Sequence, residues 1–385
     1  MIPLLVPDLP STDEILPWLR QIDNNHWYSN YGPLCLQFEK ELVKLIQQQN
    51  QLSTNSHTPN HFAMVSTCSG TTALEVGLSA YRLRPGTRVV LPSLTFPATA
   101  TAVIRSGLIP VLADVDPDSW LLTPEIAEPI VKKSGAKVVV PVSAYGQTVD
   151  EQAWQNFAEE NHCQVLIDAA GAFPGQTPRS QVDVAYSFHA TKSLGIGEGG
   201  GLLSTDENYL QVARELTNFG FSEGAVSTIG MNAKLSEYHA AVGLCQIRRF
   251  DQIKQKRNGL FKQMRKALHQ RGLPIVYQSE ESPSSPTLFV VAIPGGASDV
   301  CEYFRSKDIG VRQWYCPPLH LHPAFASYIK SHSLRFGPLI QAEQLSHRLI
   351  GLPFHPRLSS DNIQQVADVL ADALAINQTH GIAIR

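Results

Sequence analysis

A lysine beside a glycine-dense stretch is the residue best suited to covalent chemistry. Lys192 ends the segment SFHATK, which begins at Ser187, and the stretch GIGEGGG follows from Gly195. Glycine lets neighbouring backbone approach closely. A lysine partly removed from water has a lowered pKa and can form an imine with an aldehyde. The alternative is a surface lysine on a flexible turn, which this segment alone does not exclude.

Two further segments carry groups that could hold a cofactor. Asp168 ends the apolar run VLID, where it could cap a turn or pair with a protonated pyridine nitrogen. The segment Ser66–Leu74 reads STCSGTTAL and joins a predicted strand to a helix that begins near Gly70–Thr72. Its Ser, Thr and Gly residues suit an ordinary N-cap, and equally a phosphate site built from free N–H groups at a helix start.

Other short patterns point to less specific roles. Gly195, Gly197 and Gly200 form a GxGxxG pattern, which in dinucleotide-binding proteins follows a strand and opens a helix. Here a predicted strand, Leu202–Ser204, comes next, so we predict no dinucleotide site. Asp114 and Asp116, with Pro117, are typical of turns. His189 could carry a proton, but we favour a packing role that orients its loop.

The first half of the chain predicts an α/β fold. Short β-branched or apolar runs alternate with helical patterns from about residue 60 to 205. This alternation favours a mostly parallel central sheet with helices on both faces. Ligands of such sheets bind beyond the carboxyl ends of the strands. The predicted strands cover residues 62–66, 89–92, 109–113, 138–142, 165–168 and 184–188, with a small-residue helix over 97–106.

The pattern changes after Asn232. A charged segment with a 3.6-residue period predicts one long helix over residues 235–268. Two strands (274–276 and 287–293), a helix after Ser298 and a closing helix over 361–373 then predict a smaller C-terminal α+β domain. We therefore predict a large domain over residues 1–250 and a small one over 251–385. The polar stretch 49–60 predicts an exposed loop.

Composition excludes several classes of protein. Apolar residues make up 43% of the 385 residues and charged residues 17%, so a sizeable core is expected. The net charge of −3 is spread without blocks, which favours neither a nucleic-acid nor a membrane partner. The six scattered cysteines and the N-terminus, which lacks a basic stretch, favour reduced thiols, no signal peptide and a cytoplasmic location.

In combination, these motifs resemble the DegT/DnrJ/EryC1/StrS family of sugar aminotransferases. The resemblance extends from the segment WYSNYGP at residue 27 to LPFHP at residue 352. Between them lie, in the family's order, PSLTF, DVDP, AYGQ, IDAA, SFHATK…GEGG, GMNAKLSEYHAAVG and PPLH. The family comprises pyridoxal-phosphate (PLP) enzymes of fold type I, so the resemblance implies that fold, a PLP cofactor and a homodimer with shared active sites.

The resemblance also implies roles for particular residues. Lys192 matches the lysine that forms the imine link and then shuttles a proton, and Asp168 matches the carboxylate at the pyridine nitrogen. Phe96 matches the aromatic residue stacked on the cofactor ring. The remaining matches are the phosphate site (Gly70, Thr71, Thr72 and Ser187), an asparagine given to the partner's cofactor (Asn232), and residues near the substrate (Tyr28, Tyr31 and His320).

The chain departs from the family pattern at a few positions. Gly171 stands where the family usually has Gln or His near the cofactor's phenolic oxygen. Lys234 replaces the usual Arg, and Ala144 stands where a bulkier residue is common. Cys316, His320 and His322 have the spacing of a metal-binding triple, CxxxHxH. The family match places PPLH at the substrate sugar instead, so we predict no metal.

The function that the resemblance implies is amino transfer from glutamate to a nucleotide-linked keto-sugar of the 4-keto- or 3-keto-6-deoxyhexose type. It would serve amino-sugar biosynthesis for a surface polysaccharide or a secondary metabolite. The alternatives are a PLP-dependent sugar dehydratase, a cyclitol aminotransferase, and a non-catalytic sugar-nucleotide-binding or regulatory protein on the same scaffold. Dehydratase relatives carry His in place of the lysine, so Lys192 argues against that alternative. Intact Lys192, Asp168 and Ser187 argue against a loss of catalysis.

Overall fold

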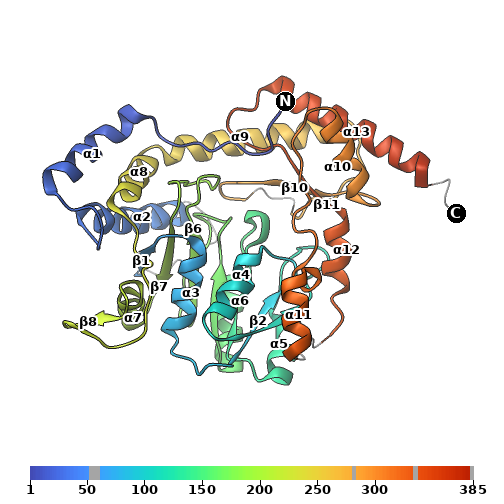
Figure 1. Ribbon diagram of the computed structural model, residues 1–385. Coiled ribbons are helices and arrows are strands. Elements are labelled where there is room, and N and C mark those ends of the chain that lie inside the picture. Colours follow the sequence, from blue (N-terminus) through green and yellow to red (C-terminus); the bar gives the residue numbers. More distant parts are fainter. Residues whose placement is uncertain (52–60, 280–282, 333–336, 382–385) are drawn as a thin grey trace.

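A seven-stranded sheet forms the centre of the molecule (Figure 1). The computed structural model describes residues 1–51, 61–279, 283–332 and 337–381. The strand order is β1-β7-β6-β5-β4-β2-β3, and β7 alone among these strands runs antiparallel to its neighbours. The strands are β1 (Ala63–Thr67), β2 (Arg88–Pro92), β3 (Ile109–Ala113), β4 (Val138–Val139), β5 (Gln164–Asp168), β6 (Val182–Ser187) and β7 (Gly200–Ser204).

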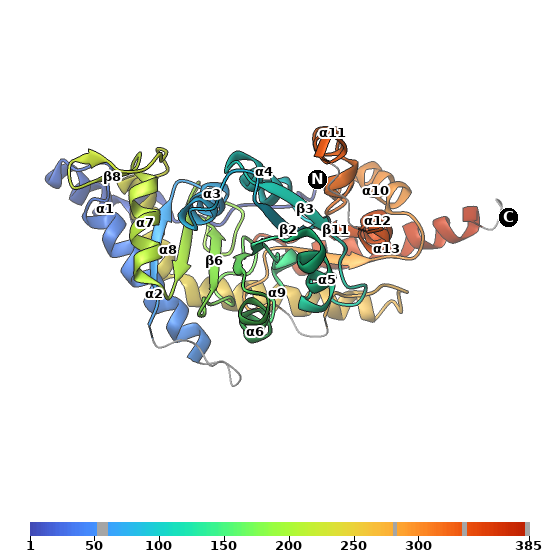
Figure 2. The same ribbon diagram turned by 90° about the horizontal axis from the view of Figure 1, so that it is seen from below.

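Helices cover both faces of this sheet (Figure 2). One face carries α3 (Gly70–Ala80), α4 (Pro97–Arg105) and α7 (Glu207–Thr217). The other carries α2 (Pro33–Gln51), α5 (Pro124–Ser134) and α6 (Glu151–Asn161). Because both faces are covered, the strands are almost entirely buried, which explains their continuous apolar runs. The predicted α/β class with a mostly parallel sheet is confirmed.

Most strand predictions agree with the structure to within a residue or two. The exception is the run at 138–142, which is a strand only over Val138–Val139. Pro141 cannot donate a backbone hydrogen bond, so the ladder does not continue through it. Of the predicted loop at 49–60, residues 49–51 belong to the end of α2 and the others lie outside the described residues.

The single long helix predicted over 235–268 is wrong. The structure has two helices, α8 (Glu237–Arg248) and α9 (Phe250–His269), which meet at Arg249. The break lets neighbouring arginines reach different partners near the N-terminus: Arg248 lies over the Trp18 ring of α1 (Thr12–Asn25), and Arg249 pairs with Asp8 at 3.0 Å. The 3.6-residue period continues through the break, so periodicity alone did not reveal it.

Of the two strands predicted for the C-terminal α+β unit, the one at 287–293 is confirmed over Phe289–Ala292 and the other is not. The predicted strand at 274–276 is absent from the sheets, and Val276 forms only an isolated bridge with Ala292. Instead β10 (Phe289–Ala292) pairs antiparallel with β11 (Leu349–Leu352). The other elements are α10 (Ala297–Ser306), η2 (Leu319–Leu321), α11 (Pro323–His332), α12 (Ile340–Arg348) and α13 (Ser360–Gly381).

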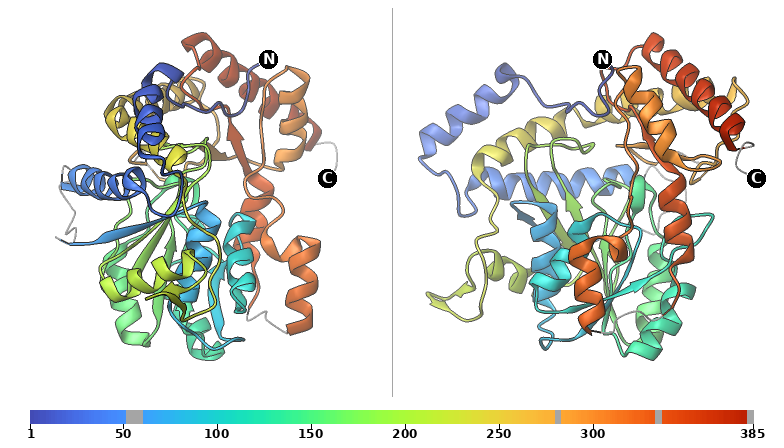
Figure 3. Two further views of the ribbon diagram at one scale, coloured as in Figure 1. Left: turned by 60° about the vertical axis from the view of Figure 1, so that its left-hand side comes forward. Right: turned by 45° about the vertical axis from the view of Figure 1, so that its right-hand side comes forward.

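Two hydrophobic cores support a division into a large and a small unit. The first contains the sheet residues, Phe250 and a few C-terminal residues such as Leu319 and Leu345. The second draws on α9 from Leu260 onward, with α10, α13 and most of the β10–β11 pair. Helix α9 thus connects the two cores (Figure 3). Ile2 packs into the second core, so the N-terminal residues cross between the units. A boundary near residue 250 stays a proposal.

Candidate active site

A cavity of about 410 Å³ lies beyond the carboxyl ends of the parallel strands. This is the position that open α/β sheets use for ligands, and the volume suits a small cofactor together with part of a substrate. Six of the residues predicted to bind the cofactor line this cavity: Gly70, Thr71, Phe96, Asp168, Ser187 and Lys192. They lie at or shortly after the ends of β1, β2, β5 and β6, so the sheet itself brings them together.

The loop that carries Lys192 is held by its own backbone. The Phe188 N–H donates to Gly199 O and the Ala190 N–H donates to Gly197 O, each at 2.8 Å. A Cβ on Gly195 would lie only 2.4 Å from Ala190 O, so the predicted close approach is present. Burial lowers the pKa of Lys192, and the nearby Asp168 charge opposes that shift. The lysine is therefore shifted toward the neutral form that attacks a carbonyl.

Asp168 is fixed by two hydrogen bonds inside the cavity wall. Its Oδ2 accepts from Thr99 Oγ1 at 2.8 Å and its Oδ1 accepts from the Ala170 N–H at 3.2 Å. The side chain is 5% exposed. Burial raises the pKa of Asp168, while the two donors and Lys192 oppose the rise. A buried carboxylate of this kind favours a cationic partner such as a protonated ring nitrogen.

The start of α3 has the free donors that a phosphate group needs. Ser69 and Thr72 form a reciprocal capping box, in which the Thr72 N–H donates to Ser69 Oγ at 3.1 Å. The N–H groups of Gly70 and Thr71 have no acceptor among the described residues. Both residues line the cavity, and Ser187 lies against Gly70. The donor set therefore fits the phosphate of PLP.

An aromatic wall of the cavity was predicted only at Phe96. Tyr145 stacks on Tyr315 with ring centroids 5.3 Å apart, and its hydroxyl donates to Trp314 O at 2.9 Å. Phe96 lies 6.2 Å from the Tyr315 ring, and the Arg312 guanidinium lies over Trp314 at 4.4 Å. All five residues line the cavity. Phe96 and Tyr145 lie in the quoted PSLTF and AYGQ motifs, whereas Trp314 and Tyr315 had no sequence signal beyond their proximity to the PPLH motif.

Several predicted site residues do not line this cavity. Thr72 caps α3 instead. His320 is buried with both ring nitrogens in contact with oxygens, Ser93 Oγ at 2.7 Å and Glu343 Oε1 at 2.8 Å, which favours an architectural role. Asn232 is exposed, with its backbone bridged to Asn218. It does not cap α8, because Ser236 is the cap of that helix.

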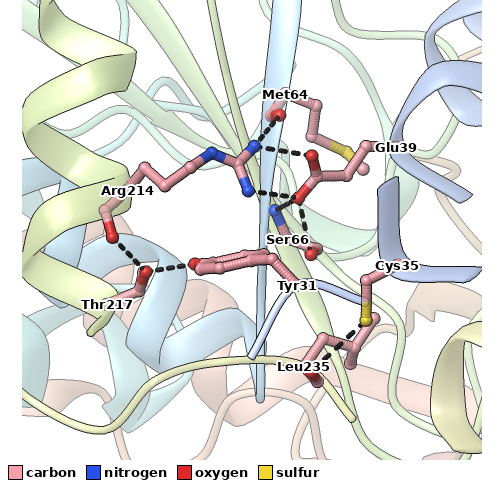
Figure 4. Close-up of polar contacts among 8 residues, drawn as sticks. All are labelled: Tyr31, Cys35, Glu39, Met64, Ser66, Arg214, Thr217 and Leu235. Carbon is pink, nitrogen blue, oxygen red and sulfur yellow. Dashed lines mark hydrogen bonds and ion pairs between the residues drawn. The ribbon is translucent and has the colours of Figure 1, made fainter. Parts of the chain in front are cut away.

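Tyr28 and Tyr31 also lie outside the cavity. Tyr28 is exposed and stacks on Tyr238 of α8 at 6.3 Å. Tyr31 bonds to Thr217 beside the ion pair of Arg214 and Glu39, whose closest contact is 2.6 Å (Figure 4). Burial raises the pKa of Tyr31 to about 12. A substrate role for either tyrosine stays a proposal.

Other sequence patterns now have structural roles. Gly200 begins β7 rather than a helix, as expected from the failed GxGxxG context. Asp116 accepts from the Ser119 N–H at 2.7 Å in a turn, whereas Asp114 holds the start of α12 through the Gln341 and Ala342 N–H groups. Among the described residues, no group of three His, Cys, Asp or Glu side chains is placed to hold a metal ion. No helix within those residues has the length and apolarity to span a membrane.

The fold and this cavity define a class: PLP-dependent transferases of fold type I. The chain belongs to the DegT/DnrJ/EryC1/StrS aminotransferase family, which it matches over residues 11–371. It is a PLP-dependent aminotransferase, as the motifs predicted.

Relatives match the chain over nearly its full length. The dTDP-4-amino-4,6-dideoxy-D-glucose transaminase of Shigella dysenteriae is 28% identical over 378 residues, covering 95% of this chain and 97% of the relative. The structure of DesI in the presence of its TDP-sugar product has a TM-score of 0.84 and 27% identity, covering 100% of this chain and 96% of DesI. S. venezuelae DesV in complex with a ketimine intermediate has a TM-score of 0.81 and 25% identity, covering 95% and 98%.

Gly70→Ala is expected to weaken PLP binding at least about tenfold and to destabilise the fold by about 1–3 kcal/mol. A Cβ at this position would lie 2.7 Å from Ser187 Cβ, so the helix start and Ser187 would have to separate. The matched control is Gly259→Ala in α9, where a Cβ meets nothing within 4 Å. That control substitution should stabilise the fold by about 0.5–1 kcal/mol. Dialysis against PLP measures the affinity, and thermal unfolding measures the stability. Unchanged PLP affinity in Gly70→Ala would contradict the phosphate site.

Proposed function

We propose that this protein transfers an amino group from glutamate to a keto-sugar carried on a nucleotide. The observation that carries the proposal is the placement of Lys192 and Asp168 in one cavity beside the free N–H groups of α3. PLP bound there supplies the electron sink for moving an amino group between carbon centres. The names of the relatives support a nucleotide sugar as the substrate class.

The chain's own groups divide the work around that cofactor. Lys192 Nζ takes and returns the proton at the reacting carbon, since its pKa is lowered by burial. The Asp168 carboxylate holds the ring nitrogen in its protonated form, with Thr99 fixing its orientation. The Gly70 and Thr71 N–H groups, with Ser187, anchor the phosphate. These anchors hold the reacting carbon beside Lys192.

The far side of the cavity suits the substrates. Tyr145 and Tyr315 offer flat apolar surfaces on which a sugar ring can pack, while Phe96 keeps its predicted place against the cofactor ring. Arg312 is exposed at the cavity and brings a guanidinium that can pair with a carboxylate or a phosphate. Amino-acid donor and sugar nucleotide both carry such anions, so one arginine can serve both half-reactions in turn.

A panel of ketones tests the substrate assignment. The protein is first converted to the pyridoxamine phosphate form with glutamate, then mixed with keto-sugar nucleotides, a cyclitol ketone, or the bare nucleotide. Return of the PLP absorbance with a keto-sugar nucleotide, together with an amino-sugar product, is the expected result. Return of the absorbance only with the cyclitol ketone would instead support a cyclitol aminotransferase. Loss of a hydroxyl from the sugar would support a dehydratase, and no conversion of any ketone would support a regulatory protein.

We further propose a homodimer in which each chain completes the other's cavity. The hairpin of β8 (Phe221–Ser222) and β9 (Ala225–Val226) projects from the body of the chain (Figure 1). Phe219, Phe221 and Val226 are about half exposed, and Ile229 is 90% exposed. Apolar side chains grouped in this way mark a protein interface. Exposed Asn232 follows them in the chain, where it can reach a partner's phosphate.

Mixing two inactive variants should restore activity. Lys192→Ala and Asn232→Ala each remove one part of a shared site. In a two-fold dimer of one chain of each kind, both lesions fall in one pocket and the other stays intact, restoring roughly half of the wild-type activity per dimer. Co-expression with two affinity tags isolates the mixed dimer for a turnover assay.

The complementation test has an internal requirement and a clear opposite result. Asn232→Ala alone must be impaired, since otherwise no rescue is needed. If Asn232 served its own chain, each pocket of the mixed dimer would carry one lesion and turnover would stay absent. Absence of rescue in verified mixed dimers would therefore contradict the shared site.

A further inference from the structure

Two side chains that line the cavity have a buried polar atom without a hydrogen-bond partner among the described residues: Thr287 Oγ1 and Trp314 Nε1. Trp314 Nε1 packs against Gly351, and a Cβ added to Gly351 would lie 2.3 Å from this nitrogen. Thr287 is different, since it is only 3% exposed yet contributes to the cavity wall. Buried hydroxyl groups are almost always paired, so an unpaired one in a binding cavity indicates a missing ligand group.

Thr287 lies next to the contact between Gly171 and Gly146. Gly171 and Gly146 are in close backbone contact, and a Cβ added to Gly171 would lie 3.3 Å from Gly146 N. The same Cβ would lie 3.8 Å from Thr287 Oγ1. Gly171 therefore contributes no side chain to the space beside this hydroxyl.

The order of the strands places Thr287 opposite the phosphate site. Ser187 ends β6 and Gly70 follows β1, both on one side of β5. Gly146 follows β4, the neighbour of β5 on the other side. Asp168, at the end of β5, therefore lies between the phosphate donors on one side and Thr287 with its two glycines on the other.

PLP has matching chemistry on its two edges. Its ring nitrogen lies opposite the aldehyde carbon, the phosphate arm is attached on one flank of that carbon, and a hydroxyl group on the other. With the nitrogen at Asp168, the aldehyde carbon at Lys192 and the phosphate at Gly70, the ring oxygen faces the β4 side. We propose that Thr287 is a further cofactor-binding residue whose hydroxyl donates a hydrogen bond to that ring oxygen. This inference rests on the proposed placement of PLP.

A donor at the ring oxygen has two measurable consequences. It stabilises the negative charge on the oxygen, which lowers the pH at which the visible absorbance of the bound cofactor titrates. It also adds one hydrogen bond to the bound state alone. Loss of the hydroxyl should therefore raise the titration midpoint by roughly half to one pH unit and weaken PLP binding about fivefold.

Three variants separate this role from a structural one. Thr287→Val keeps the shape without the hydroxyl, and Thr287→Ser keeps the hydroxyl. Ser285→Ala is the matched control, because Ser285 Oγ is also buried without a partner among the described residues but does not line the cavity. Each purified holoenzyme is titrated by visible absorbance, its PLP dissociation constant is measured by dialysis, and its apoprotein is melted.

The expected result is a raised midpoint and weaker PLP binding in Thr287→Val, with near wild-type behaviour in Thr287→Ser and Ser285→Ala. The apoprotein of Thr287→Val should melt no lower than wild type, because it loses no internal hydrogen bond. A wild-type midpoint and affinity in Thr287→Val, with PLP still attached to Lys192, would overturn this inference and leave the proposed function standing. If wild-type protein binds no PLP at all, the proposed function and this inference fail together.

Discussion

Lys192→Ala is expected to lower turnover on the order of 10⁴-fold or more. In the proposed site the Lys192 amine forms the imine link, and the same atom moves the proton at the reacting carbon. Its removal leaves the phosphate donors and Asp168 intact, so the variant should still bind PLP, or the product of PLP and the amino donor. Absorbance spectra and a single-turnover assay with glutamate measure the two properties separately.

The control for this variant is a lysine elsewhere on the protein. Lys137→Ala removes an exposed lysine next to the start of β4 that does not line the cavity. It should keep wild-type turnover. The Lys192→Ala apoprotein should also melt close to wild type, because a partly buried amine with a lowered pKa stabilises the fold little. Normal turnover by Lys192→Ala would refute the assignment of the site.

Asp168→Asn is the second substitution with a large expected effect, a loss of at least about 10²-fold in kcat. The amide occupies the same space and can still accept from Thr99, so the fold of the cavity should persist. It cannot, however, hold a protonated ring nitrogen through a charge-assisted bond. Without that proton the ring accepts electrons poorly, and the chemical step slows. Steady-state kinetics with glutamate and the accepted ketone give the value.

Thr99→Val is the comparison for Asp168→Asn, because it changes a neighbour of the carboxylate and not the carboxylate. It removes the 2.8 Å bond to Asp168 Oδ2 without touching the carboxylate itself. A smaller loss of about tenfold is expected, in line with the loss of one hydrogen bond to a charged group. If kcat of Asp168→Asn falls by less than about tenfold, the carboxylate acts only within its turn, through the Ala170 N–H.

The parts of this molecule that could be predicted from sequence are those whose causes are local. The strands around Val111 and Leu166 are apolar on both faces because helices cover both sides of the sheet, and such runs are visible in the chain. Asp168 ends a strand, and Lys192 and Gly70 each follow one, so the parallel arrangement brings them to one edge. Their convergence follows from topology once the strands are recognised.

The rest of the cavity depends on contacts between distant segments. Thr287, Arg312 and Trp314 come from the C-terminal part, which folds back over the sheet and carries no motif of its own at these positions. Thr99 could not be distinguished from other small residues of α4, since its bond to Asp168 spans 69 positions. The contacts at the break between α8 and α9 likewise join residues far apart in the chain, Arg249 with Asp8 and Arg248 with Trp18.

Borohydride trapping tests the central claim most directly. Wild-type protein purified with PLP is reduced with sodium borohydride, digested and analysed by mass spectrometry. An imine between PLP and a lysine becomes a stable secondary amine, so the cofactor mass stays on one peptide. The predicted result is a single modified residue, Lys192, with loss of the visible absorbance on reduction. Attachment to a different lysine, or retention of bound PLP without any modified peptide, would contradict the account.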